Sequence, residues 1–99
     1  MLVTKVSDLT ASNVAEYLRL VDPNNDDLNT LTSLLGVAKA YVTQYTGKTL
    51  VKLDDYQDII IAVLVLCQDM WDNRSLYVDD SNVNKVVESI LSLHSENLL

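Results

Sequence analysis

An uninterrupted apolar run from Ile59 to Cys67 is the strongest pattern in the chain. A helix that crosses a membrane needs about 20 such residues, so this run is too short and we expect no membrane segment. Polar, helix-permissive residues flank the run, which favours one helix from Tyr56 to Arg74 over a strand. A helix that is apolar on every face must be covered on every face. In a chain this small, we expect partner subunits to supply part of the cover.

Apolar residues at helical spacing predict a first helix from about Ala11 to Leu20, with Thr10 as its N-cap. Its inward stripe is expected to consist of Val14, Tyr17, Leu18 and Val21. The helix should end at Asp22-Pro23, because proline disfavours the helical conformation in the residue before it and lacks an amide proton.

A second, longer helix is predicted from Asp26 or Asp27 to Thr46. Gly47 supplies the left-handed conformation that commonly ends a helix. Two stripes run along it, and two stripes suggest two different packing neighbours. The first, a lengthwise seam, holds Leu28, Leu31, Leu35, Ala38, Val42 and Tyr45, and the second holds Leu34, Val37 and Tyr41.

A last helix is predicted to begin at Asp80 or Ser81. Its buried face is expected to hold Val83, Val86, Val87, Ile90 and Leu93. The segment from Lys48 to Leu53 is expected to be a connection, after which Asp54 or Asp55 caps the central helix.

These patterns predict an all-α fold in a single domain over residues 1–99. About four helices form a small bundle around the central helix from Tyr56 to Arg74. A hydrophobic content of 48% is enough to build a core without metal or disulfide support.

The loop from Ser75 to Asp80 carries an apolar tripeptide, which is unusual for a solvated loop. Together with the second stripe of the long helix it forms surplus apolar surface. The candidate subunit-interface residues are therefore Leu34, Val37, Tyr41, Leu76, Tyr77 and Val78.

Chemistry-bearing residues are few. Cys67 is the single cysteine and His94 the single histidine, so the chain offers neither a zinc cluster nor a nucleophile beside a base. We expect Cys67 to be a buried, inert thiol and His94 to lie in solvent or to complement a helix dipole. We predict no catalytic, cofactor-binding or metal-binding residues, and hence no enzyme.

Charge and the N-terminal sequence narrow the function further. Fourteen acidic against seven basic residues give a net charge of −7, which opposes binding to phosphate backbones. Residues Met1 to Lys5 show no long apolar stretch, so we expect no secretory signal and a reducing cytoplasm as the compartment of synthesis.

Four short motifs occur in a recognisable order. They are Tyr17-Leu18-Arg19, Asp26-Asp27-Leu28, the stretch from Ala38 through Tyr41-Val42 and Tyr45-Thr46-Gly47-Lys48-Thr49-Leu50, and Met70-Trp71-Asp72-Asn73-Arg74. In this order they resemble the head-tail connector family of tailed bacteriophages, small helical adaptors also described as DNA-packaging proteins. The resemblance covers about Val6 to Arg74. It departs from the family at Lys48, where arginine is usual, and at Asp54-Asp55, where a proline is common.

The resemblance implies a virion structural protein at the head-tail junction, made in the host bacterial cytoplasm. Many copies would form a homo-oligomeric ring beneath the portal protein and continue the DNA channel. The far face of the ring would meet the next connector or a tail-completion protein. DNA would pass through without specific binding, which the acidic balance suits. The six candidate interface residues would then form the seam between subunits.

Two other functions remain open at the level of sequence. The chain could be a small acidic helical regulator or an antitoxin-like protein-binding module, which would usually be a dimer with one defined partner. An acyl carrier protein is the third reading, but its Asp-Ser-Leu attachment motif is missing, since Ser33 follows Thr32 and Ser75 follows Arg74. Trp71 is expected to close one end of the core, with docking to a partner as the alternative.

Overall fold

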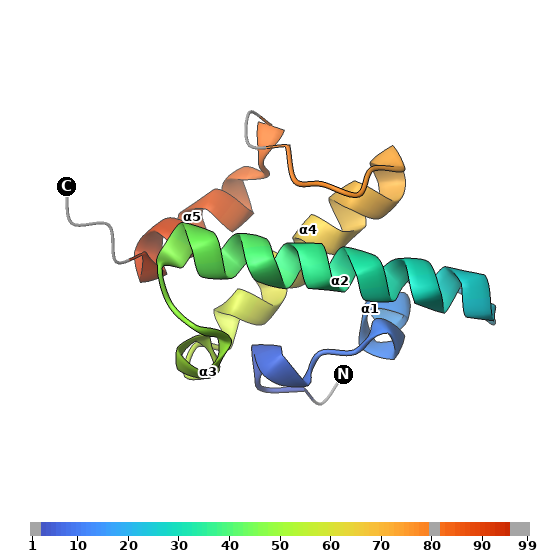
Figure 1. Cartoon of the computed structure of the whole chain (residues 1–99), viewed down its shortest axis with the longest axis horizontal. Helices are drawn as coiled ribbons and strands as arrows, with labels where there is room; N and C mark the ends of the chain where they lie inside the picture. The colour runs from blue at the N-terminus through green and yellow to red at the C-terminus, as the bar shows by residue number, and fades with distance from the viewer. Residues whose placement is uncertain (1–2, 80–81, 96–99) are drawn as a thin grey trace.

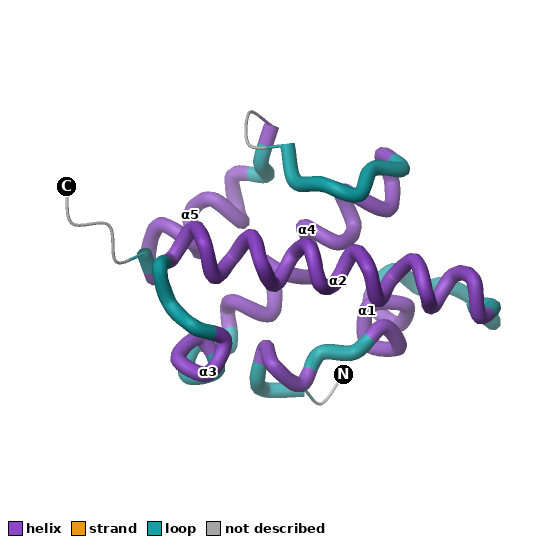
Figure 2. Tube along the Cα trace, viewed as in Figure 1, coloured by secondary structure: helices purple, strands orange, loops and turns teal. Residues whose placement is uncertain are grey.

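The computed structural model describes residues 3–79 and 82–95 of the chain. The described residues form a 3-10 turn and five α-helices, without a strand (Figure 2). The predicted all-α fold is therefore confirmed. In chain order the elements are η1 (Val6–Asp8), α1 (Ala11–Tyr17), α2 (Asn25–Thr46), α3 (Leu50–Leu53), α4 (Asp58–Asn73) and α5 (Lys85–His94).

The long helix α2 crosses the middle of the molecule and packs most extensively on α4, which crosses it from behind (Figure 1). Helix α1 packs near the N-terminal half of α2, and α5 lies beside its C-terminal half and against α4. The short α3 and η1 contact each other on the side of α2 away from the loop that joins α4 to α5. The core therefore lies where α2, α4 and α5 meet.

Helix α4 supplies more of this core than any other element. Its buried residues are Ile59, Ile60, Ala62, Val63, Leu64, Leu66, Cys67 and Met70. Fully burying one large apolar side chain contributes about 1.5–3 kcal/mol, so this helix dominates the stability of the fold. The other helices do not cover α4 completely: on one face Ile61 is 51% exposed and Val65 is half-buried.

The ends of α2 follow from its sequence. The Asp27 amide donates to Asn24 Oδ1 (2.8 Å), and the Asn24 amide donates to Asp27 Oδ2 (3.2 Å), which is a capping box. At the other end Gly47 has φ 72° and its amide donates to the Thr43 carbonyl. The predicted end is confirmed, and the start lies slightly earlier than predicted because Asn24 is the cap.

Helix α1 begins as predicted, with Thr10 in a capping box with Asn13, but it ends at Tyr17 rather than near Leu20. Arg19 has φ 59°, a left-handed conformation that ends the helix before the proline can. As a result the predicted inward stripe is wrong at Val21, which is 88% exposed. The connection after Gly47 also contains a turn of helix that the pattern missed, α3, capped by Thr49. The predicted cap of the central helix is wrong, because Asp54 ends α3 and α4 begins only at Asp58, after Gln57.

Helix α5 begins at Lys85, where the Asn84 side chain accepts from the Val86 amide (2.8 Å). The predicted starts, Asp80 and Ser81, lie outside the described residues. Its buried residues are Val87 and Leu91. The predicted face is wrong at Val86, which is 54% exposed, and at Leu93, which is 75% exposed. Helix α5 packs on α4 and α2 with the face that holds Val87 and Leu91 instead.

Arg74 caps α4 in a left-handed conformation with φ 56°. This conformation costs a residue with a Cβ about 1–2 kcal/mol, whereas glycine adopts it freely. We expect Arg74→Gly to raise the free energy of unfolding by about 0.5–1 kcal/mol, measured by urea denaturation. Arg74→Ala, which removes the charge but keeps the Cβ, serves as the control and should bring no gain. Equal or lower stability of Arg74→Gly would contradict the strain argument.

Candidate interaction surface

The loop after α4 presents its apolar side chains outward. The Ser75 amide donates to the Met70 carbonyl (3.0 Å), and the Ser75 hydroxyl donates to the Tyr77 carbonyl (3.5 Å), so the chain turns sharply here. Leu76 is 64% exposed and Tyr77 is 66% exposed, while Val78 is half-buried against the core. The structure thus leaves two adjacent large apolar side chains of this loop in solvent.

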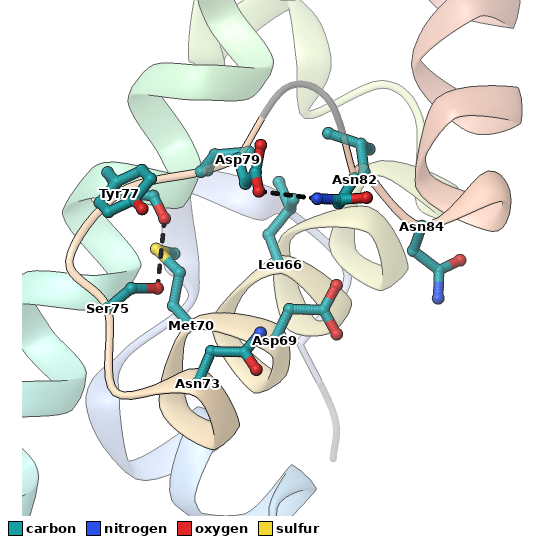
Figure 3. A pocket seen from close by; sticks show the side chains of 11 residues that line it. Leu66, Asp69, Met70, Asn73, Ser75, Tyr77, Asp79, Asn82 and Asn84 are labelled. Carbon is teal, nitrogen blue, oxygen red and sulfur yellow. Dashed lines mark hydrogen bonds between the residues drawn. The ribbon is translucent and has the colours of Figure 1, made fainter.

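A cleft of about 570 Å³ lies between this loop, α4 and the start of α5 (Figure 3). We call it the loop cleft. Leu66 and Met70 of α4 and Val78 and Val83 of the connection give it apolar walls, and the remainder is polar. The residues that line it are Leu66, Asp69, Met70, Asn73, Ser75, Tyr77, Val78, Asp79, Asn82, Val83 and Asn84.

Two aspartates give the loop cleft an acidic character. Asp69 and Asp79 both line it, and Asp79 Oδ2 accepts from the Asn82 side-chain amide (2.9 Å). Burial raises the pKa of Asp69, and repulsion from Asp72 one helical turn later raises it further. A positive group placed in the cleft would relieve both effects.

A smaller cleft of about 210 Å³ lies beside the same loop. It is lined by Asp27, Thr30, Leu34, Met70, Trp71, Arg74, Ser75 and Leu76. Trp71 is half-buried here, packed against the core, so it serves the core as predicted while one part of it stays accessible. Arg74 is exposed at the rim, at the C-terminal end of α4.

The six candidate interface residues have different positions. Leu34 is 1% exposed and belongs to the chain's own core, and Val37 and Tyr41 are half-buried against that core. Leu34 and Leu76 line the same small cleft. The second stripe of α2 and the apolar loop tripeptide are therefore neighbours rather than separate surfaces. Tyr41 lines a third cleft of about 530 Å³ together with Tyr45, Val83 and others. Whether any of them meets another subunit stays a prediction.

His94 has a partner that the sequence did not reveal. Its Nε2 lies 2.8 Å from both carboxylate oxygens of Asp58, and its ring stacks on Tyr56 with centroids 4.2 Å apart. Lys48 Nζ lies 4.9 Å from the centroid of the Tyr56 ring. The cluster joins the last turn of α5 to the first turn of α4, where the Asp58 carboxylate complements the helix dipole. We call it the His94 clasp.

Among the described residues no group of three or more histidine, cysteine, aspartate or glutamate side chains is arranged to hold a metal ion. No helix in this part of the chain is long and apolar enough to span a bilayer. Comparison of the sequence with protein-family models and curated proteins, and of the fold with solved structures, finds no match.

Cys67 lies fully buried in the middle of α4, and burial raises the pKa of its thiol to about 12. The thiol therefore stays protonated in the folded chain, while in the unfolded chain it ionises near its ordinary pKa of 9.0. Since the folded state holds this proton more tightly, its stability falls as the pH rises between these two values.

We expect a thiol-specific disulfide reagent to leave folded Cys67 unmodified at about pH 8 and to react fully once denaturant unfolds the chain. Absorbance of the released thiolate measures the reaction. Rapid modification without denaturant would show that α4 is less well covered than the structure indicates.

Proposed function

We propose that the protein is a head-tail connector of a tailed bacteriophage, which assembles as a ring beneath the portal and continues the DNA channel toward the tail. The proposal rests on the order of motifs from Tyr17-Leu18-Arg19 to the segment ending at Arg74, and on one structural observation. That observation is the exposed pair Leu76 and Tyr77, of which Tyr77 lines the loop cleft and Leu76 lines the smaller cleft beside it. Contiguous exposed apolar surface of this kind is typical of interaction sites.

Other apolar side chains are exposed away from this loop. Val51 in α3 is 77% exposed, and Ile61 in α4 is 51% exposed. A ring of identical subunits requires two different patches per subunit, because each contact joins one patch to another on the next copy. The exposed apolar residues outside the loop are candidates for that second patch.

The net charge of −7 supports the channel function. A polyanion that slides through a channel should be held nowhere along it, and acidic side chains repel phosphates. The protein would guide DNA without gripping it.

Substituting the half-buried Tyr41 and the exposed Tyr77 should block assembly. We expect Tyr41→Asp combined with Tyr77→Asp to abolish large oligomers, because each carboxylate would have to be desolvated in the subunit contact. Native mass spectrometry and light scattering measure the oligomers, with and without purified portal protein. Tyr77→Phe keeps the apolar ring and should assemble like the unchanged chain. Unchanged assembly of the double variant would remove these residues from the seam, and a stable dimer with one defined partner would favour the regulator.

The unchanged protein should not shift duplex DNA in a gel at physiological salt. Charge repulsion predicts no complex at protein concentrations of about 10 μM, near the range where non-specific DNA-binding proteins bind. A basic DNA-binding protein in the same gel is the positive control. A tight complex would overturn the proposal that DNA passes without being held.

A further inference from the structure

The segment around the short helix α3 places the exposed Val51 and Lys52 side by side. Asp54, which follows, accepts hydrogen bonds from Ser7, and Asp55 is exposed. Two of the seven basic residues, Lys48 and Lys52, lie within five positions of each other, with the 77%-exposed Val51 between them. Thr49 caps the helix, with the Lys52 amide donating to its hydroxyl (3.3 Å), and Leu53 is fully buried beneath it. The helix is therefore fixed to the core rather than loosely attached. We call Val51 and Lys52 the α3 knob, since Lys48 is half-buried with its Nζ 4.9 Å from the centroid of the Tyr56 ring.

The loop cleft has the opposite character. Asp69 and Asp79 line it, Asp72 follows one turn later on α4, and Tyr77 presents an exposed aromatic ring at its mouth. The cations nearest in sequence are Arg74, which lines the small cleft, and Lys85, which starts α5 just beyond the lining residue Asn84. The lining itself includes no lysine or arginine.

The knob and the cleft point in different directions. In Figure 1, α3 lies below α2 and the loop from α4 to α5 lies above it, so α2 separates the two. One copy therefore cannot fill its own cleft with its own knob. Two complementary surfaces on opposite sides of a subunit are the arrangement that head-to-tail contacts require.

We propose that the α3 knob of one copy occupies the loop cleft of the next copy, and that this contact closes the ring. The inference rests on the proposed ring assembly and names the two surfaces that meet in it. The occupant is a second copy because the knob brings the positive charge that the lining of the cleft lacks, together with an exposed aliphatic side chain that would pack on its apolar walls. A cleft of about 570 Å³ falls within the size range of clefts that enclose small ligands, which is enough for the side chains of such a knob.

The contact would combine burial with charge pairing. The aliphatic stem of Lys52 would pack on the Tyr77 ring while its ammonium group approaches Asp69, as long basic side chains do at apolar surfaces. Val51 would be removed from water at the same time. Because the charged groups stay near solvent, the pairing sets the register of the contact more than its strength, and salt weakens it.

Paired cysteines test this contact directly. Since Cys67 is buried, cysteines introduced at Val51 and Tyr77 would be the reactive ones. A short bismaleimide added to the double variant, Val51→Cys with Tyr77→Cys, should give a ladder of covalent multimers on a denaturing gel. A mixture of the two single variants should give only the heterodimer, and neither single variant alone should cross-link. Val21→Cys, at a position 88% exposed and outside both surfaces, replaces Val51→Cys in the matched control.

Charge reversal tests the charged pair within the same cross-linking experiment. Lys52→Glu should lower the yield of the ladder severalfold, and Asp69→Lys in the same chain should restore it, because the reversed pair attracts again. Both substituted residues lie at the surface or at the edge of the core, and circular dichroism checks that each variant folds.

The outcomes separate this pairing from the proposed function. Rings seen by native mass spectrometry, with a control that cross-links as well as the designed pair, would overturn the pairing and leave the connector function standing. Homodimers through Val51→Cys or Tyr77→Cys alone would replace head-to-tail contact with a two-fold dimer and overturn both. Absence of any oligomer, with portal protein present, would also overturn both.

Discussion

The burial of α4 is the constraint on which the rest of the structure depends. Eight of its side chains are buried, and helices α2, α5 and α1 all contact it. A helix of this composition is unstable in water on its own, so the arrangement of its neighbours is set by the need to cover it. Where that cover ends, at Ile61 and at the loop after Asn73, apolar groups reach the surface. Helix α4 thus supplies much of the core, and the loop that follows it carries the candidate interaction surface.

Helix ends that depend on one or two neighbouring residues could be predicted from the sequence. Gly47 ended α2 as expected, and Thr10 capped α1, because both effects need only a few neighbouring residues. Arg19 and Arg74 adopt left-handed conformations, which the residue type arginine does not indicate. The predicted end of α1 is therefore wrong. The buried face of α5 was also misjudged. Val86, Val87 and Leu91 are all apolar, and contact with α2 and α4 decides which are covered.

The candidate interaction surface was predictable in part, because one of its signals is local in the sequence. The apolar tripeptide Leu76-Tyr77-Val78 stands out in a polar loop, and two of its three residues are exposed in the structure. Leu34 could not be assigned from its spacing, since the stripe on which it lies packs into the core beside Met70 and Trp71. The pair of His94 with Asp58 had no sequence signal, because only the fold brings these two residues together. The α3 knob is contiguous in the sequence, but the pattern predicts a connection there rather than a helix.

The His94 clasp has a consequence for how the protein can change. By tying residue 94 to residue 58, it fastens the open end of a hairpin formed by α4 and α5. The connecting loop lies at the opposite, closed end, near Tyr77. The His94–Asp58 pair lies at one end of the hairpin, and the exposed Leu76 and Tyr77 lie at the other. New side chains at that tip can therefore alter which molecule is recognised while the helical frame keeps its shape, which is the condition under which binding specificity diverges easily.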